Sequence, residues 1–504
     1  MIETLLFFFL LLFFFLIVRC TGKSTSDHLH LPPSPPSLPL LGHLHLLSSS
    51  LHTSLHTLSA AHGPLLLLRL GPSRRLLVVS SAEVATHIFK THDLAFSSRP
   101  VFAFAEKLPF GLAGFVTAPY GPYWRFVKKV CMTELLSPRQ LEGSKKVRKE
   151  EMEGWVKGML EHVREKGGAI DLGSQLMKLT NNITCRMAMT TCCLEKYEDA
   201  EKIRQLVKES FELAAKLCFG DVLGPLKQLS FWVYGKKALD VSKRYDELLE
   251  KVLKEHEHKR SSRDSENQRD LMDILLDVHH DPHAEFKITR THIKAFFLDL
   301  FIAGTNTSAE GTQWAMAELL NHPEAFERVR KEIELVTDNG RLVEESDVGK
   351  MPYLQAVVKE TLRLHPPAPV TTRECRQHCK INGFDVAAKT AVAINLYAIM
   401  RDPDSWDNPN EFVPERFFLQ EEDERMKFNF VPFGGGRRGC PGTELAFIFI
   451  NTAVAAMVQC FDWKIGEDGK GKKVNMQSGS SGLSLSMAQP LLCVPLLHFN
   501  PYHA

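Results

Sequence analysis

The most chemically informative stretch of the sequence is a glycine-rich loop that ends in a cysteine. Residues 433–442 read Phe-Gly-Gly-Gly-Arg-Arg-Gly-Cys-Pro-Gly, and no Gly-Lys-Ser or Gly-Lys-Thr follows, as a phosphate-binding loop requires. Glycines let a backbone approach closely and direct N–H groups at a sulfur, which stabilises a thiolate. We therefore expect Cys440 to present a thiolate to a metal. Phe433 can shield the sulfur from water, Arg438 can neutralise an anionic cofactor, and Gly442 would let a following helix pack close.

Two other polar clusters lie inside stretches with helical periodicity. In Glu360-Thr-Leu-Arg363 the three-residue spacing places both charged side chains on one helical face, where they can pair, as ordinary surface ion pairs do. Ala303-Gly-Thr-Asn-Thr-Ser308 lies midway along a helix expected from about Thr291 to Leu320. Glycine and threonine are poor helix formers, so this cluster needs a reason, and close packing around Gly304 supplies one.

The spacing F-x-x-G-x-R-x-C-x-G resembles the haem-binding loop of the cytochrome P450 superfamily. Phe433, Gly436, Arg438, Cys440 and Gly442 meet it without departure. The resemblance implies a mainly α fold with a smaller β-rich portion, and a haem b held between an oxygen-handling helix and the cysteine loop. It identifies Cys440 as the iron ligand, and a thiolate ligand favours cleavage of dioxygen.

The same resemblance gives the Glu360–Arg363 pair a partner. Pro414-Glu-Arg-Phe417 is similar to a family segment that supplies a second arginine, here Arg416. The resemblance implies that Glu360, Arg363 and Arg416 form a buried structural triad behind the haem. Buried charges without full pairing are costly, so the loss of one partner is expected to harm folding and haem retention.

In the oxygen-handling helix, the resemblance implies a local opening over the haem and assigns proton management to the hydroxyl of Thr307. The family commonly has an acid directly before this threonine, whereas this sequence has Asn306. An amide can hydrogen-bond or order water, but it cannot shuttle a proton as a carboxyl does. Asn306 is thus the one departure from the family pattern at the reaction site.

Tyr123-Trp-Arg-Phe-Val-Lys128 resembles the segment in which a tryptophan and a basic residue bind a haem propionate. Trp124 and Lys128 take these positions, and lysine supplies charge without the bidentate fork of arginine. Arg373 matches another propionate-binding position. The expected apolar walls of the substrate cavity are Phe297, Phe301, Ile302, Val370 and Leu483.

The implied activity is an NADPH- and O2-dependent hydroxylation of a C–H bond. No G-x-G-x-x-G fingerprint for a flavin or nicotinamide is present, so electrons must come from a separate flavoprotein, the NADPH-dependent cytochrome P450 reductase. Arg125, Lys128, Lys129 and Arg437 are candidates for its docking face. Segments 220–227 and 397–403 resemble the plant branch that acts on flavonoids, isoflavonoids and some triterpenes.

We expect a small apolar or aromatic substrate, most simply a flavonoid or isoflavonoid. A triterpenoid hydroxylase of the same superfamily is an alternative. A haem-thiolate isomerase or dehydratase that works without dioxygen, and an anchored protein that only binds haem or a partner, stay open as well.

The N-terminus predicts a retained membrane anchor. Leu5 to Val18 is an unbroken apolar run, with no basic residue before it, Arg19 and Lys23 after it, and no small-x-small cleavage motif. As a helix, Met1 to Cys20 would span roughly 30 Å, about one hydrocarbon core, and we expect residues 1–22 to form the anchor. The proline-rich residues 23–45 predict a stiff hinge. The positive-inside rule then places residues 46–504, the catalytic domain, on the cytosolic side of the endoplasmic reticulum membrane.

The elements that must position these residues belong to one large domain of the 504-residue chain. Residues 65–80 predict a hairpin, helical patterns cover 199–215, 245–258 and 291–320, and short strands are expected near 380–395 and in the C-terminal region. The charged residues 259–270 predict a surface loop, and His256 beside it is expected to face water. The net charge of +1 does not suggest a nucleic-acid binder.

Overall fold

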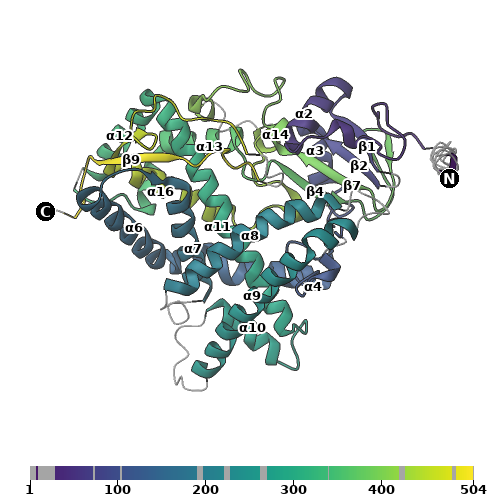
Figure 1. Cartoon of the computed structure of the whole chain (residues 1–504), viewed down its shortest axis with the longest axis horizontal. Coiled ribbons are helices and arrows are strands. Elements are labelled where there is room, and N and C mark those ends of the chain that lie inside the picture. The colour runs from purple at the N-terminus through teal and green to yellow at the C-terminus, as the bar shows by residue number, and fades with distance from the viewer. Residues whose placement is uncertain are drawn as a thin grey trace.

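The protein was analysed as a computed structural model, which describes residues 7–8, 29–71, 74–102, 105–189, 197–220, 228–260, 270–338, 340–418, 426–479 and 484–502. Long helices make up most of it, and a small sheet lies near the N-terminal part of the described chain (Figure 1). The predicted mainly α fold with a smaller β-rich portion is confirmed. The long helices are α2 (Leu51–His62), α4 (Pro122–Val130), α6 (Lys145–Glu165), α7 (Leu172–Met189), α8 (Tyr197–Gly220), α9 (Gln228–Arg260), α10 (Leu271–His280), α11 (Arg290–Asn321), α12 (Pro323–Thr337), α13 (Pro352–Leu364) and α16 (Thr443–Cys460).

The largest sheet has the strand order β1-β2-β7-β4. The predicted hairpin is confirmed as β1 (Leu65–Leu70) and β2 (Arg74–Val79), which pair antiparallel. β7 (Ala391–Asn395) lies parallel to β2, and β4 (Val370–Glu374) closes the edge antiparallel to β7. The sheet joins the start of the chain to its last third, and it places Arg373 of β4 next to the cysteine loop, where its guanidinium donates to the Gly435 carbonyl at 3.4 Å.

Two smaller sheets hold later parts of the chain. β5 (Cys379–Ile381) and β6 (Phe384–Val386) form a hairpin. Asn382 and Gly383 between them both have positive φ, as a two-residue turn of the primed type requires. β3 (Ile170–Asp171), β9 (Leu492–Leu497) and β8 (Phe461–Ile465) form the third sheet, which ties the C-terminal segment to the start of α7.

α11 runs through the middle of the helical part (Figure 1) and packs against α7, α13 and α16. The apolar residues of α11 lie on every side of the helix, a pattern expected of a buried helix. More than half of the residues of α11 are buried. Its start is fixed by a capping box in which Thr289 and His292 bind each other's backbone N–H groups. The predicted helix from Thr291 to Leu320 is confirmed within one residue at each end.

α16 follows the cysteine loop directly and is the one helix in the described part of the chain that is long and apolar enough to cross a membrane. Buried residues make up 67% of it, and it packs on α11, α12 and α13. α16 is therefore a helix of the protein core. The expected anchor, residues 1–22, lies outside the described residues except for Phe7 and Phe8.

The described part of the proline-rich segment lies against the first sheet. The Leu67 N–H donates to the carbonyl of Pro33 at 2.8 Å, and the His43 ring bonds to Pro35 O and to the Arg69 N–H, both at 2.7 Å. Gly42 has φ +61, and a Cβ there would overlap the carbonyl of Arg69, so only glycine fits. The segment thus joins the folded body of the protein at a fixed place.

Two helices are longer than their sequence patterns indicated. The pattern at 199–215 is part of α8, and the pattern at 245–258 is only the second half of α9. Most of the charged segment predicted as a loop, residues 261–269, lies outside the described residues.

Candidate functional site

The cysteine loop is folded back on itself and held against the short helical turn His87–Thr91. The Cys440 N–H donates to the carbonyl of Phe433 at 3.0 Å, which closes the loop. Gly436 has φ +64, and a Cβ there would overlap the Asp93 carboxylate and come within 3.0 Å of the Phe89 carbonyl. Asp93 in turn accepts the Arg437 N–H at 2.8 Å and pairs with its guanidinium at 3.1 Å. The predicted need for glycine is met at Gly436.

The thiol of Cys440 is the exposed one among the seven free cysteines of the described chain. Desolvation raises its pKa, while the Gly442 N–H, the Lys128 charge, the Thr443 hydroxyl and the Arg99 charge oppose that rise. These four groups favour a thiolate. A Cβ on Gly442 would meet only the Cys440 sulfur, at an ordinary 3.9 Å, so its predicted role in close helix packing finds no support; its backbone N–H is what the site uses.

Phe433, the first residue of the cysteine loop, is half-buried. Its ring packs edge-on against Phe447 of α16, with ring centres 5.3 Å apart. This contact fixes the first residue of the loop to the helix that follows it. The position is compatible with the shielding role expected for Phe433.

Three arginines lie close together near Cys440. Arg373 and Arg438 are buried, and Arg99 is half-buried. None of the three forms an ion pair with an acid of the described chain. Burial, followed by the charges of the other arginines, lowers the pKa of Arg373 far below its usual value. Burial and then Arg99 lower the pKa of Arg438 to about 9.

Hydrogen bonds hold two of these guanidinium groups in place. Arg438 donates to Ser97 O and Ala118 O, both at 2.6 Å. Arg373 donates to the hydroxyl of Thr371 and the carbonyl of Thr372, both at 2.9 Å. Neutral acceptors fix the geometry but do not balance the charge.

The indole of Trp124, at the start of α4, completes this group. It is buried, the Arg438 guanidinium lies 4.4 Å from its ring centre, and Phe115 stacks on it at 5.7 Å. Its Nε1–H has no partner in the described part of the chain. Buried donors are nearly always paired, so an acceptor from another molecule is expected here.

These features fit haem b. A cluster of arginines with no acid of the described chain at ion-pair distance, together with an orphaned indole N–H, suits a group with two carboxylates, and the thiol of Cys440 suits its iron. Lys128 bonds to the Gly439 carbonyl at 3.3 Å, so it lies at the cysteine loop. Arg99 does not stand out in the sequence, because a lone Arg-Pro pair carries no motif and only the fold brings it near Cys440.

The oxygen-handling segment of α11 is a continuous α-helix, so the local opening expected over the haem is not found. Thr307 is half-buried, and its hydroxyl donates to the Ala303 carbonyl at 2.8 Å. A Cβ on Gly304 would lie 3.0 Å from the Thr184 hydroxyl of α7. Close packing against α7 therefore explains the glycine at position 304, as the sequence led us to expect.

Asn306 is buried and donates from Nδ2 to Glu310 Oε1 at 2.8 Å. Burial raises the pKa of Glu310 to about 7. On the same helix, burial raises the pKa of Asp299 to about 6, although Val116 N–H and Arg99 oppose the rise. Neither acid stood out in the sequence, where each is one carboxylate within a long helical pattern.

The three charged residues behind the site come together as expected. Arg363 donates to both oxygens of Glu360, at 2.7 and 2.8 Å, and Arg416 donates to Glu360 Oε1 at 2.9 Å. All three are buried. The remaining guanidinium N–H groups bind backbone carbonyls of residues 400–411, so the cluster ties α13 to the chain segment before the cysteine loop.

The residues expected to line the substrate cavity differ in how deeply they are buried. Ile302 and Val370 are half-buried. Phe297 and Phe301 are fully buried in a hydrophobic cluster with α8, α9 and α10. With Gly304 they lie at i, i+4 and i+7, the face that packs on α7, so they serve as core residues rather than cavity walls. Leu483 lies outside the described residues.

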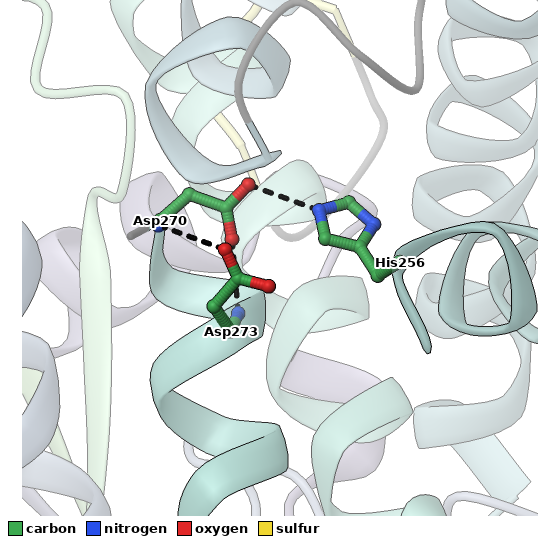
Figure 2. A group of neighbouring side chains, drawn as sticks. All are labelled: His256, Asp270 and Asp273. Atoms are coloured by element: carbon green, nitrogen blue, oxygen red, sulfur yellow. Dashed lines mark hydrogen bonds and ion pairs between the residues drawn. The ribbon is translucent and has the colours of Figure 1, made fainter. Parts of the chain in front are cut away.

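His256, Asp270 and Asp273 form the one group of three potential metal ligands found in the described residues (Figure 2). His256 is buried, not facing water as predicted, because its ring binds Asp270 at 2.9 Å and the Val252 carbonyl at 3.2 Å. The two aspartates form the capping box of α10. Each member already has a structural role, so we assign no metal to this group.

Comparison with known proteins gives consistent matches. A family model for cytochrome P450 matches residues 32–494. Cytochrome P450 705A22 of Arabidopsis thaliana is 45% identical, over 95% of this chain and 93% of that protein. Two Glycine max enzymes are similar over 94–95% of each chain: beta-amyrin 24-hydroxylase at 42% identity and 3,9-dihydroxypterocarpan 6A-monooxygenase at 41%. A zebrafish cytochrome P450 structure with progesterone is 26% identical, covers 88% of this chain and 99% of that one, and has a TM-score of 0.73.

Proposed function

Because this chain belongs to the cytochrome P450 family, we propose that it hydroxylates a C–H bond of a flavonoid or isoflavonoid. The family membership itself makes the chain a haem-thiolate monooxygenase. Its cofactor is haem b, its oxidant is O2, and electrons come from NADPH through a separate reductase.

The observation that carries the site assignment is the cluster of buried arginines and the orphaned Trp124 N–H beside Cys440. We assign iron ligation to Cys440 and propionate binding to Trp124, Lys128, Arg373 and Arg438, as the sequence predicts, and we add Arg99 to this set. The thiolate-ligated haem supplies the activation of dioxygen when it is bound. The Gly442 N–H and the nearby positive charges hold negative charge on the Cys440 sulfur.

Lys128 is better placed at the cysteine loop than on the reductase docking face. Its ammonium bonds to the Gly439 carbonyl, whereas Lys129 pairs with Glu285 at 3.2 Å and Arg437 pairs with Asp93. These exposed pairs are weak and can exchange partners when an acidic protein docks. We therefore keep Lys129 and Arg437, with the exposed Arg125, as docking candidates.

The substrate assignment rests on similarity and on the apolar residues at the site. The pterocarpan 6A-monooxygenase shares 41% identity over nearly its whole length. Ile302 and Val370, two of the predicted cavity residues, are apolar and half-buried, which is compatible with contact to a flat aromatic molecule. A triterpenoid is the second candidate, since beta-amyrin 24-hydroxylase shares 42% identity over a similar span.

The test is turnover of both substrate panels by microsomes that contain the protein and a reductase. We expect an oxygenated flavonoid or isoflavonoid whose formation requires NADPH and O2. Oxidation of triterpenoids alone would replace the first assignment with the second. Product formed without NADPH and O2 would indicate an isomerase or dehydratase instead.

We further propose that residues 1–22 anchor the protein in the endoplasmic reticulum membrane, that residues 23–45 orient it and that residues 46–504 form the cytosolic catalytic domain. The apolar run at Leu5 to Val18 and the packing of the proline-rich segment on β1 support this arrangement. The full-length protein should sediment with membranes through a carbonate wash. Removal of residues 1–22 should release most of it; a protein still fully resistant to the wash would contradict the anchor.

A further inference from the structure

Glu310 lies one helical turn beyond Asn306, on the same face of α11. It is buried and receives two hydrogen bonds, both on Oε1: from Asn306 Nδ2 at 2.8 Å and from the Ser484 hydroxyl at 3.1 Å. Its second oxygen, Oε2, is buried and has no partner in the described part of the chain. Asn306 stands where the family commonly has an acid, and its amide is in direct contact with a carboxyl, that of Glu310.

The distribution of donors shows where a proton would sit. An ionised carboxylate would leave Oε2 buried and charged without a donor, which is costly. A carboxylic acid with its proton on Oε2 instead keeps both donors on Oε1 and adds one O–H at the orphaned oxygen. Burial raises the pKa of Glu310 to about 7 in line with this geometry, so the group can exchange a proton near neutral pH.

The helices around Glu310 carry charged residues, but none of those in the described chain acts on its carboxyl. The helices packed nearest are α7, through the bond from Thr180 to the Thr305 carbonyl, and α13 and α16, through Leu362 and Ile450 at Gly311. Charged residues of these helices are Lys178 and Arg186 of α7, Lys359, Glu360 and Arg363 of α13, and Glu444 of α16. No charged side chain of the described residues contributes to the pKa of Glu310.

Other acids of α11 lie too far along the helix to take this position. Asp299 is eleven residues earlier and Glu318 eight residues later, which correspond to about 16 Å and about 12 Å along the axis. Asp299 bonds to the Val116 N–H at 2.8 Å, and Glu318 bonds to His365 at 2.6 Å. Among the described carboxyl groups of this helix, Glu310 alone contacts Asn306.

We propose that Glu310 is a positioning and proton-holding residue that acts through Asn306, and that it replaces the acid which the family commonly places directly before the threonine. One proton leaves Oε2 through water that the Asn306 amide orders and that the Thr307 oxygen holds as a hydrogen-bond acceptor, and the dioxygen substrate takes it up together with an electron from the reductase. The Asn306 N–H and the Ser484 hydroxyl hold the resulting carboxylate, and a proton from solvent restores the acid. Thr307 donates its own proton to the Ala303 carbonyl, so its oxygen remains available as an acceptor.

This inference rests on the monooxygenase activity but can be tested before any substrate is known. The ferric holoenzyme is titrated without substrate or reductase, and the infrared C=O stretch of protonated carboxyl groups is followed with pH. We expect a band that titrates near neutral pH and disappears in Glu310→Gln. Asp299→Asn and Glu318→Gln serve as controls and should keep it. A band unchanged in Glu310→Gln would refute the proposal.

Coupling of NADPH consumption to product supplies the second readout. Glu310→Gln preserves shape and hydrogen bonds, so the protein should fold and keep its thiolate-haem spectrum. We expect its product per NADPH to fall by roughly tenfold or more and to lose its pH dependence around neutrality. The double variant Asn306→Asp with Glu310→Gln exchanges acid and amide, and it should restore coupling.

These experiments distinguish a failure of the role proposed for Glu310 from a failure of the proposed substrate. Wild-type coupling in Glu310→Gln, or no rescue in the double variant, would show that Glu310 is only structural. An infrared band as expected in a protein that turns over neither substrate panel would instead count against the proposed substrate and leave Glu310 as the proton holder.

Discussion

Removal of the negative charge at Glu360 is expected to be the most damaging isosteric change in the protein. Glu360→Gln leaves Arg363 and Arg416 buried at 0% and 8% exposure without the carboxylate that both of them bind. The variant keeps the size and most of the shape of the side chain. Its effect therefore reports the charge and its hydrogen bonds rather than a cavity.

The magnitude follows from the geometry. Glu360 accepts four hydrogen bonds: two from Arg363, one from Arg416 and one from the Val413 N–H at 3.0 Å. Breaking a buried ion pair by removing one partner costs about 3–5 kcal/mol, because the remaining charge stays buried. Here two guanidinium groups lose the same partner, so the upper part of that range is expected. The backbone carbonyls bound to both arginines limit the loss.

The assay is urea denaturation of the holoenzyme, followed in parallel by tryptophan fluorescence and by the thiolate-haem absorbance. Lys243→Ala is the matched control, since it removes an exposed ion pair with Glu247 in α9 and should cost about 0.3–0.5 kcal/mol. We expect Glu360→Gln to lose haem at a lower urea concentration than this control. Equal midpoints for the two variants would refute the assignment of Glu360 as the charge that holds α13 to the segment before the cysteine loop.

Other variants test the site around the cysteine. Cys440→Ala should abolish the thiolate spectrum of the reduced, carbon-monoxide-bound protein and all oxygenation; retention of either would overturn the ligand assignment. Arg99→Met should raise the haem dissociation rate by about tenfold or more, because a hydrogen bond to a charged group contributes about 1.5–3 kcal/mol, and a rate equal to wild type would exclude Arg99 from propionate binding. Gly436→Ala should cost at least about 1 kcal/mol in a urea titration, since its φ of +64 and the overlap with Asp93 both disfavour a side chain. Glu310→Gln should change how the free energy of unfolding depends on pH. The pKa of Glu310 in the folded protein is about 7, above the ordinary 4.5, so folding favours the protonated acid. The stability of the wild-type protein therefore falls as pH rises from 4.5 to about 7. The variant lacks this titration and should gain up to about 3 kcal/mol relative to wild type across that window; parallel stability curves would contradict the raised pKa.

Local sequence was sufficient wherever the signal lay within one element. The hairpin at Leu65–Val79 follows from two apolar runs around a Gly-Pro turn, and α11 follows from a long, mostly apolar stretch without proline. The cysteine loop has short-range glycine spacing, and one of its glycines, Gly436, has the positive φ and close approach that the spacing indicated. In such cases backbone sterics and periodicity act over a few residues, and the sequence displays them directly.

Long-range packing corrected several local interpretations. His256 stands next to a charged segment, yet it is buried because it binds the cap of α10. Phe297 and Phe301 are apolar and near the motif of α11, yet they face the helix core. An amphipathic pattern shows that a face is buried, but only the fold shows whether it is buried by a neighbouring helix or by a ligand.

By itself, then, the sequence was enough to predict Cys440 as the proposed iron ligand, the charged pair of α13 and the departure at Asn306, because each prediction depends on residue type and short spacing. Only the tertiary structure shows that Arg99 lies close to Arg373 and Arg438. It alone also shows that the carboxyl of Glu310 accepts a hydrogen bond from the amide of Asn306. The physical reason is desolvation. The charge state of a buried group depends on which distant segments exclude water from it and which donors they bring, and those are properties of the packed chain.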